Sequence, residues 1–368
     1  MTKHPLTIAL IYEDPAVYAL HHHPAASLSH LEVGAAAPAI TTALQSQGHT
    51  VHPIPSIHAL LAHLTTPETP KWDLAFDITE GVYGPAREAQ VAAVLEAHRI
   101  PRTFSDAATM ALCLDKGRTK MVLEHFGVAT APFAVVHFDD SPLKKELSGE
   151  EILGQMRRSQ HAETLLGPGG WPLFVKPLAE GSSKGIALGN RVASEKELVR
   201  VVNALRAASP SSLGVLVESF LPGREFTVGI LGTGVDAWVV GVDEIVWSGA
   251  KGDKGTVEFT TEKSKSSDDW NGEADEVKVT REDKEADLAC ETALRAWRAL
   301  RCRDGGRVDV RMDGAGVAHA MEINPLAGLL PSWSQLPLIA EHNGVSFDEM
   351  IDHIVQSALK RTVSHTVV

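Results

Sequence analysis

Several features are scarce in this sequence, and each scarcity argues against a class of protein. Cysteine occurs only three times in 368 residues, as Cys113, Cys290 and Cys302, and this spacing fits neither a disulfide framework nor a zinc motif. A reducing compartment such as the cytoplasm is therefore expected. No apolar run reaches the roughly 18 residues that span a bilayer. The N-terminal apolar run is interrupted at residues 13–15, so we expect a buried strand there and not a signal peptide.

Positive charge is scarce as well. The chain has 34 Lys and Arg against 47 Asp and Glu, which gives a formal net charge of -13. Because a nucleic-acid groove needs Lys and Arg to neutralise phosphates, we expect neither nucleic acid nor a membrane as a partner. The rest of the composition, 44% hydrophobic and 22% charged, is that of a globular protein, and the length indicates two or three domains.

The first 115 residues alternate between strand and helix patterns. Strands are predicted at 6–12, 51–54, 72–78 and 100–104, and helices at 32–47, 57–64, 86–98 and 106–113. This order predicts a mostly parallel sheet, and ligands bind such sheets beyond the carboxyl ends of the strands. Those ends carry Glu13, Asp14 and the segment 79–84.

Two later segments are expected to be irregular. Residues 139–170 are polar and end in Gly167-Pro-Gly-Gly170, which indicates a helix with loops. Residues 251–285 are strongly charged and contain several glycines. We interpret this stretch as a long mobile loop, either a lid over a site or a solvated surface excursion.

A predicted β-hairpin near the C-terminus is the most informative stretch of the chain. Because side chains alternate faces along a strand, Arg307 and Asp309 share one face of the first strand. On the second strand Glu322 and Asn324 share a face, and Met321 is expected to point away from it.

The register of this hairpin suggests a metal site. A four-residue turn at 313–316 would pair Asp309 with Ala320, which brings Asp309, Glu322 and Asn324 to one side of the sheet. Carboxylate and amide oxygens are hard ligands that suit Mg2+ bound together with water and phosphate. The alternative is a hairpin with one polar, solvated face. An arginine beside the carboxylates and a glycine soon after them favour a catalytic site.

The middle of the chain has features of phosphate binding. A strand ends in Lys176 and is followed by Glu180-Gly-Ser-Ser-Lys-Gly185, where glycines permit tight turns and Ser182 and Ser183 offer hydroxyl donors. The run is not a Walker motif, and a plain Gly–Ser hairpin loop is the alternative. A second lysine, Lys116, stands where a helix is predicted to begin, and the alternative there is a solvated first helical turn.

A strand–turn–strand pattern at 215–231 surrounds Pro222-Gly223. An acidic residue and an apolar strip at such a bend could hold an adenine through backbone hydrogen bonds, with Glu225 accepting hydrogen bonds from ribose hydroxyls. The alternative is simply a strand, a turn and another strand.

These segments, in this order, resemble the ATP-grasp ligases, and among them the D-alanine–D-alanine ligases. The matching runs are 114–120, 175–183, 217–228, 306–310 and 321–328, with weaker matches at 32–36 and 76–81. The resemblance covers nearly the whole chain, and five ordered motifs are more specific than any one of them. It implies an N-terminal α/β domain followed by two α+β domains that clamp ATP, with boundaries at 1–115, 116–216 and 217–368.

The resemblance also implies roles for individual residues. Nucleotide-binding positions are Lys116, Lys176, Glu180, Ser182, Ser183, Glu218, Phe220, Leu221, Glu225 and one of Lys263 and Lys265. Two Mg2+ ions are expected on Asp309, Glu322 and Asn324, and the catalytic group is Arg307, the backbone N–H of Gly328 and Ser182. The implied reaction converts a small carboxylate to an acylphosphate at the expense of ATP, and an amine then attacks it. We expect a cytoplasmic homodimer.

The substrate half of the chain departs from the family pattern. The glutamate that anchors the first D-alanine falls on His30, the serine that holds the second carboxylate falls on Trp333, and 79–81 replaces a His-Gly pair. Substrate contacts are therefore expected among His30, Glu32, Glu80, Glu88, Trp333 and Ser334. We expect a ligase that joins a different acid and amine. The alternatives are an authentic D-alanine–D-alanine ligase and a non-catalytic, ATP-binding regulatory protein.

Overall fold

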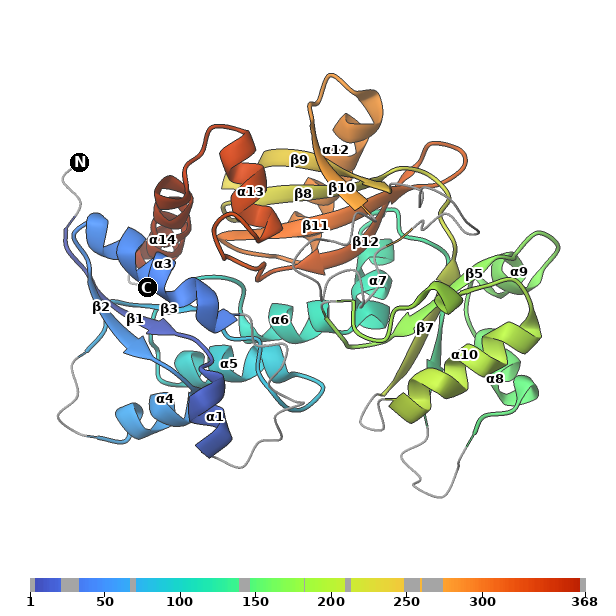
Figure 1. Cartoon of the computed structure of the whole chain (residues 1–368), viewed down its shortest axis with the longest axis horizontal. Coiled ribbons are helices and arrows are strands. Elements are labelled where there is room, and N and C mark those ends of the chain that lie inside the picture. Colours follow the sequence, from blue (N-terminus) through green and yellow to red (C-terminus); the bar gives the residue numbers. More distant parts are fainter. Residues whose placement is uncertain are drawn as a thin grey trace.

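The computed structural model describes residues 4–20, 33–66, 71–138, 146–181, 183–208, 213–247, 259 and 274–364. They form three β-sheets with helices packed against them, and the helices α6 (Ala107–Leu114) and α7 (Lys116–His125) run through the region where the three sheets meet (Figure 1). None of the helices in these segments is both long and apolar enough to cross a membrane.

The first sheet is parallel, as predicted, with the strand order β2-β1-β3. Its strands are β1 (Thr7–Ile11), β2 (Thr50–Ile54) and β3 (Leu74–Asp77), and its helices are α1 (Pro15–Leu20), α3 (Val33–Ser46), α4 (Ile57–Leu64), the 3-10 turn η1 (Arg87–Ala89) and α5 (Gln90–Ala97). The prediction of a strand at 100–104 is wrong. Arg102 makes one isolated bridge to Ala75, and the backbone of Phe104 then turns into the left-handed region with φ of 65°.

The second sheet is antiparallel, in the order β4-β7-β5-β6, and its helices can be followed in Figure 1. Its elements are β4 (Phe133–His137), α8 (Gly149–Met156), α9 (Ala162–Leu166), β5 (Leu173–Pro177), η2 (Leu188–Asn190), β6 (Arg191–Val192), α10 (Glu195–Ala208) and β7 (Gly214–Ser219). β7 pairs with both β4 and β5, so this strand runs through the domain boundary expected between 216 and 217. A boundary after β7 fits the sheet better.

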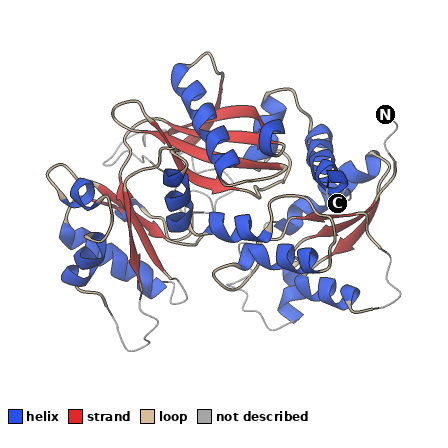
Figure 2. Cartoon of the chain, turned by 180° about the vertical axis from the view of Figure 1, so that it is seen from behind, coloured by secondary structure: helices blue, strands red, loops and turns tan. Residues whose placement is uncertain are grey.

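The third sheet is also antiparallel, in the order β10-β9-β8-β11-β12. Figure 2 shows the molecule from behind, with the strands of the sheets in red and the helices beside them in blue. Its elements are β8 (Glu225–Leu231), η3 (Gly234–Asp236), β9 (Trp238–Trp247), β10 (Ala274–Val279), α12 (Lys284–Ala299), β11 (Gly305–Met312), β12 (Ala318–Asn324), α13 (Gln335–His342) and α14 (Phe347–Ser364). The interpretation of 251–285 as one loop is partly wrong, since β10 pairs along β9 within it. Residues 251–258 and 260–273 lie outside the described part of the chain.

The hydrophobic cores show how the three sheets are joined. One core contains Ile8 and Phe76 of the first sheet together with Ile339 and Ile354 of the C-terminal helices. The apolar residues of the second sheet, such as Val175, form a separate core. The first and third sheets therefore share buried apolar surface, and the second sheet stands beside them with a core of its own.

Candidate active site

The β11–β12 hairpin presents its polar residues in direct register. Arg307 lies opposite Asn324 and Asp309 lies opposite Glu322, with a register shift between Asp309 and the next residue. The predicted pairing of Asp309 with Ala320 is therefore wrong, because β12 carries one extra residue in a β-bulge. The shift does not change the face: the three oxygen-bearing side chains still lie on one side of the sheet.

Met321 occupies the bulge. Val310 pairs with Ala320 and Asp309 pairs with Glu322, which leaves Met321 without a partner on β11. Met321 lines the same cavity as Asp309 and Glu322, so the expectation that it points away is wrong. Strict alternation fails here because a bulge turns two successive side chains toward one face.

Asp309 is held by several neighbours. The Thr227 hydroxyl donates to its Oδ1 at 3.1 Å, and the Asn324 amide donates to its Oδ2 at 3.4 Å. The Arg307 guanidinium lies 3.3 Å from Oδ1 and also donates to the side-chain oxygen of Gln335. These contacts fix the positions of the carboxylate and the guanidinium relative to each other.

Lys116 reaches the hairpin from another part of the chain. It is the first residue of α7, whose N-cap is Asp115, and it is only 6% exposed. Its ammonium donates to the Glu180 carbonyl at 2.5 Å and lies 3.1 Å from the Glu322 carboxylate. The alternative of a solvated first helical turn is therefore wrong. Lys116 links the loop after β5 to the polar face of β12.

A buried charge cluster lies nearby. Glu218 forms ion pairs with Lys120 at 2.8 Å and with Lys176 at 2.7 Å, and all three side chains are buried. Burial alone would raise the pKa of Glu218, but the two ammonium groups outweigh it and lower the pKa to about 2. Lys120 lies in the matched run 114–120, but the family resemblance assigned it no role. Its spacing of four residues from Lys116 on the same helix is the signal that could have identified it.

A cavity of about 120 Å³ lies between the second and third sheets, and we call it the nucleotide cavity. The rings of Phe174, Phe220 and Phe259 approach one another on its wall, with centroids 4.9 to 6.5 Å apart. Arg311 lies 5.1 Å from the Phe220 ring and pairs with Glu225 at 3.0 Å. Other lining residues are Lys176, Ser183, Glu218, Leu221, Thr227, Asp309, Met321 and Glu322.

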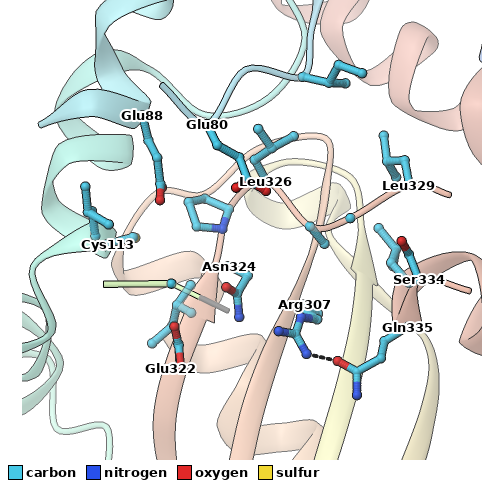
Figure 3. A pocket seen from close by; sticks show the side chains of 18 of the residues that line it. Glu80, Glu88, Cys113, Arg307, Glu322, Asn324, Leu326, Leu329, Ser334 and Gln335 are labelled. Atoms are coloured by element: carbon cyan, nitrogen blue, oxygen red, sulfur yellow. Dashed lines mark hydrogen bonds between the residues drawn. The ribbon is translucent and has the colours of Figure 1, made fainter. Parts of the chain in front are cut away.

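A second cavity, of about 210 Å³, adjoins it, and we call it the substrate cavity (Figure 3). Its lining includes Glu80, Glu88, Lys116, Glu180, Asn324, Leu326, Gly328, Leu329, Leu330, Trp333 and Ser334. Three residues, Arg307, Glu322 and Gln335, line both cavities. The two spaces therefore meet at the polar face of the hairpin.

Gly328 stands at a close approach of the backbone to another segment. A Cβ at this position would lie 2.7 Å from the Ser334 hydroxyl oxygen, so a larger residue would displace that side chain. The same hydroxyl accepts from the Leu330 N–H at 3.0 Å. The loop after β12 is thus folded tightly around the substrate cavity.

The structure brings most predicted site residues to these two cavities. Glu80, Glu88, Trp333 and Ser334 line the substrate cavity, and so do two predicted nucleotide positions, Lys116 and Glu180. The other described nucleotide positions line the nucleotide cavity, and they are Lys176, Ser183, Glu218, Phe220, Leu221 and Glu225. The expected positions outside the described part are His30, Glu32, Ser182, Lys263 and Lys265. Sequence reasoning assigned no role to Arg311, Thr227, Gln335 or Phe259.

The donor set at the hairpin limits which metal it suits. The described residues contain no group of three or more His, Cys, Asp or Glu side chains that could hold a metal ion. A cation at Asp309, Glu322 and Asn324 would therefore depend on water or phosphate oxygens for its remaining ligands. Mg2+ characteristically binds in that way, through a few protein oxygens and substrate phosphates.

Comparisons with known proteins agree with this geometry. The family model described as D-ala D-ala ligase C-terminus matches residues 122–356. A D-alanine–D-alanine ligase of Gluconobacter oxydans is 31% identical over 327 residues, covering 87% of this chain and 91% of the relative. A second, from Xanthomonas axonopodis pv. citri, is 30% identical over 321 residues, covering 87% and 88%.

Solved structures show the same fold. The D-alanine–D-alanine ligase from Bacillus anthracis complexed with ATP aligns with a TM-score of 0.69 and 18% identity, covering 99% of this chain and 100% of that one. The VanG D-Ala:D-Ser ligase from Enterococcus faecalis aligns with a TM-score of 0.67 and 19% identity, covering 96% and 100%. The expected α/β and α+β ATP-grasp fold is thereby confirmed.

The names of the curated relatives favour the alternative of a D-alanine–D-alanine ligase over the expectation of a different acid and amine. The family itself follows from the matched model and from relatives that are similar over most of their length. This chain belongs to the D-alanine–D-alanine ligase family of ATP-grasp enzymes, and it is an ATP-dependent ligase that forms a carbon–nitrogen bond.

Proposed function

We propose that the protein binds ATP in the nucleotide cavity, activates a carboxylate in the substrate cavity as an acylphosphate, and transfers the acyl group to an amine. The observation that carries this proposal is the wall shared by the two cavities, formed by Arg307, Glu322 and Gln335. A nucleotide in one cavity and a carboxylate in the other would meet at this wall, with the terminal phosphate beside the carboxylate. Proximity of the two reacting groups is the main requirement for phosphoryl transfer.

The nucleotide cavity suits ATP chemically. Aromatic rings line one side, and no described residue accepts a hydrogen bond from the backbone N–H of Leu221, which leaves it available to an adenine nitrogen. Glu225 stands nearby as an acceptor for ribose hydroxyls, and Lys176 faces the cavity as a cation for phosphate. The ATP named in the Bacillus anthracis structure supports this assignment.

Magnesium fits the polar face of the hairpin. Asp309, Glu322 and Asn324 offer hard oxygen donors in neighbouring register positions, and phosphate or water would complete the coordination. The family pattern gives two ions. Bound there, the metal would neutralise charge on the transferring phosphate.

The residues around the shared wall can perform both chemical steps. In the first, a carboxylate oxygen forms a bond to the γ-phosphorus while the bond to the β-phosphate oxygen breaks, and ADP leaves. In the second, the amine nitrogen attacks the acyl carbon, loses its proton, and inorganic phosphate leaves. Arg307 and Gly328 line the substrate cavity, and in this proposal the guanidinium and the Gly328 N–H stabilise the negative oxygen that develops on that carbon. Lys116, which pairs with Glu322, offsets charge there.

A direct assay tests this function. We expect ADP release that requires ATP, a carboxylate and an amine together, with a product whose mass equals the acid plus the amine minus water. Tight ATP binding without ADP release for any acid and amine would instead support the non-catalytic regulatory protein.

D-alanine is the first substrate to test, as both acid and amine, because the curated relatives carry that name. ADP release with D-alanine alone and a product with the mass of the dipeptide would establish this pair. A second candidate is a different amine, because Trp333 lines the cavity where the family pattern has a serine for the second carboxylate. An indole offers a carboxylate at most one N–H donor, and an unpaired carboxylate is costly to bury.

Trp333→Ser distinguishes these candidates. Trp333 is 41% exposed, so the substitution should not disturb the core. We expect the preferred amine to change by about tenfold or more in kcat/KM while the KM for ATP stays the same, because a hydroxyl restores a donor for a carboxylate. Steady-state kinetics across an amine panel gives this ratio. An unchanged amine preference would mean that Trp333 does not line the amine subsite.

The oligomeric state and the substrates complete the proposal. The partners are small molecules, an acid and an amine, and the family resemblance favours a cytoplasmic homodimer. Light scattering on the purified protein measures the mass in solution, and a monomer would contradict the dimer without affecting the proposed reaction.

A further inference from the structure

Positive charge is scarce in the chain as a whole, but it is concentrated around one further cavity. This cavity, of about 870 Å³, shares no lining residue with the nucleotide cavity or the substrate cavity. Its walls include the end of α5 with residues 99–102, the turn at 232–236, the end of α12 with residues 301–303, and α14. We call it the basic cavity. It lies where the N-terminal part of the chain meets the third sheet and the last helix.

Cations outnumber carboxylates in the basic cavity. Seven of its lining residues are arginine or lysine, and two, Glu96 and Asp236, are acidic. Asp106 and Asp304 do not line the cavity, but each pairs with one of its arginines. Even when these two are counted, there are seven cations to four carboxylates. In a chain with a net charge of -13, such a cavity is a local attraction for anions.

Two of the arginines, Arg99 and Arg301, occupy the same position at the ends of two different helices. Each stands two residues after the last helical residue, with φ of 54° and 58°. In both turns the N–H of the next residue donates to the carbonyl five residues back, at 2.9 Å and 3.0 Å. Glycine is the usual residue at this left-handed position, because other side chains are strained there. An arginine at both ends, in one cavity, suggests that the side chains are needed for something other than the turn.

The side chains of Arg99 and Arg301 are available to a ligand. Both residues are exposed, and neither guanidinium has a hydrogen bond or an ion pair within the described part of the chain. The alternative is a purely structural role, since a cation near the last carbonyls of a helix is favourable. Replacement by glycine separates the two roles, because it removes the cation and at the same time relieves the backbone.

Three further arginines of the basic cavity keep unused donors. Arg298 donates through Nε and Nη2 to two backbone carbonyls, and Arg303 and Arg361 each pair with a carboxylate through Nη2. In none of the three does Nη1 have a hydrogen-bond partner among the residues that the structure describes. Guanidinium N–H groups match the oxygens of phosphate in geometry and charge.

Like charges also lie close together in this cavity. Burial lowers the pKa of the Arg361 guanidinium, and the charges of Arg303 and Arg102 add to this effect against the opposing charge of Asp304. A bound anion would relieve this repulsion.

We propose that the basic cavity binds a compact anion with two or more phosphate groups, at a site separate from the nucleotide cavity. A phosphate group brings more negative charge than a carboxylate and three strong acceptor oxygens. The volume of about 870 Å³ is within the roughly 300–1,000 Å³ of small-molecule sites. The net negative charge of the whole chain argues against an extended nucleic acid as the ligand. This inference does not depend on the proposed reaction.

The double variant Arg99→Gly/Arg301→Gly tests the proposal, and inorganic tripolyphosphate is the probe. The matched control is Arg157→Gln/Arg158→Gln, which also removes two exposed arginines, neither of which lines the basic cavity. Calorimetric titration without magnesium measures the affinity, and thermal unfolding with and without the probe measures stabilisation. Any binding of the probe in the nucleotide cavity is common to all these proteins. Only the difference between wild type and glycine variant is therefore assigned to the basic cavity.

We expect tripolyphosphate to bind the wild type and the control and to raise their melting temperatures. The glycine variant should bind at least tenfold more weakly, because two charge-assisted donors are lost. Without the probe it should melt at or above the wild-type temperature, since two strained left-handed residues have become glycine. The variant Arg99→Asn/Arg301→Asn repeats the test with a residue that also tolerates positive φ, and it should lose the same affinity.

ADP distinguishes the source of the phosphate groups. Trp238 is 39% exposed on the wall of the basic cavity and offers a surface on which a base can stack. A nucleotide ligand predicts a second ADP-binding event that the glycine variant lacks, whereas an inorganic chain predicts that only tripolyphosphate shows the difference.

Two results would overturn the proposal. One is the absence of tripolyphosphate binding in the wild type, and the other is the same affinity in the wild type and in both double variants. If light scattering showed that the glycine variant changes its mass in solution while the wild type binds no tripolyphosphate, the arginines would belong to a protein interface. Because binding and melting are measured without turnover, a failure of the proposed ligase reaction leaves this test unaffected.

Discussion

Glu218 lies buried between the ammonium groups of Lys120 and Lys176, so three charges share a region with little water. Burial opposes ionisation of the carboxyl group, and the two lysines reverse that effect and bring the pKa of Glu218 to about 2. Its folded pKa is therefore below the ordinary value of 4.5. The stabilisation is present above that ordinary value and is lost only as the pH falls through the folded value.

Glu218→Gln should destabilise the protein by about 3–5 kcal/mol at neutral pH, because it leaves two buried ammonium groups without a counter-charge. Urea unfolding of both forms measures the change. The matched control is Glu285→Gln, since Arg224 keeps its contacts with Glu244 and Asp283 when that partner is removed. If Glu218→Gln were as stable as Glu285→Gln, Lys120 and Lys176 would not need the Glu218 carboxylate as a counter-charge.

Glu13 shows the opposite shift. It is fully buried, and burial raises the pKa of its carboxyl group from 4.5 to about 8 despite the two N–H groups that it accepts. Because the folded state holds the proton more tightly than the unfolded state, the contribution of Glu13 to stability is greatest below the ordinary value. It declines as the pH rises toward about 8 and then stays constant.

Glu13→Gln should therefore flatten the dependence of stability on pH. Between about pH 5 and pH 8 the wild type should lose a few kcal/mol that the variant does not lose. Thermal unfolding of both proteins across this range gives the comparison. Two parallel curves of melting temperature against pH would show that Glu13 does not titrate in the expected window.

Several residues of the site could not be predicted because their roles depend on contacts between distant segments. Cys113 and Cys302 have no paired spacing, yet a hydrogen bond between their thiols is the largest cause that raises the pKa of Cys113. Lys116 was visible as a lysine at a helix start, but its contact with Glu322 required α7 to lie against β12. Spacing along the sequence carries no information about such contacts.

Among the elements, the β11–β12 hairpin was the most predictable. Alternation of polar and apolar residues gave the two strands and the shared face of Asp309, Glu322 and Asn324. The bulge at Met321 was not predictable, since nothing in the local pattern marks one extra residue. The strand β10 was missed for a related reason: its sequence is highly charged, and it is a strand because it pairs with β9.

For the β11–β12 hairpin we predict that substitutions on its polar face lower activity and leave stability nearly unchanged. Glu322→Gln and Asn324→Ala should each lower turnover by about a hundredfold or more, with a higher magnesium requirement and little loss of stability. Activity titrated against magnesium and thermal unfolding are the measurements. The loss is expected because each change removes one oxygen donor or its charge.

Asp313 in the turn of the same hairpin provides the control. Its carboxylate accepts the N–H groups of Ala315 and Val317, and Asp313 is not among the residues that line either cavity. Asp313→Asn should lower the melting temperature and leave turnover intact. If Glu322→Gln and Asn324→Ala gave that same pattern, the polar face of the hairpin would be merely structural.

At the scale of the whole molecule, the first and third sheets are joined by a common hydrophobic core, and the second sheet is not part of it. The first sheet and the C-terminal helices bury apolar residues against each other, while the second sheet has a separate core. The nucleotide cavity lies between the second and third sheets, at the junction that the shared core does not cross. Domain boundaries placed along the sequence could not show this, because the sequence order does not reveal that α14 returns to the first sheet.

Asp304 reinforces the union of the first and third sheets. It is 0% exposed, and its carboxylate accepts the Phe104 N–H at 2.7 Å, the Thr233 hydroxyl at 3.0 Å and the Ser357 hydroxyl at 2.7 Å. It also pairs with Arg361 of α14. One carboxylate thus joins the end of the N-terminal part, the turn after β8 and the last helix.

Asp304→Asn should destabilise the protein by about 3–5 kcal/mol, because an amide cannot accept at both positions and Arg361 loses its charged partner. The control is Asp236→Asn. Asp236 pairs with Lys360 of α14, and the two side chains are 65% and 70% exposed. This substitution should therefore change the free energy of unfolding by less than about 1 kcal/mol. Urea unfolding is followed separately by near-ultraviolet circular dichroism and by proteolysis. In the wild type the first and third sheets should unfold in a single, coincident transition, and only in Asp304→Asn should their transitions separate. Coincident transitions with wild-type stability would mean that the apolar core alone holds the two parts together.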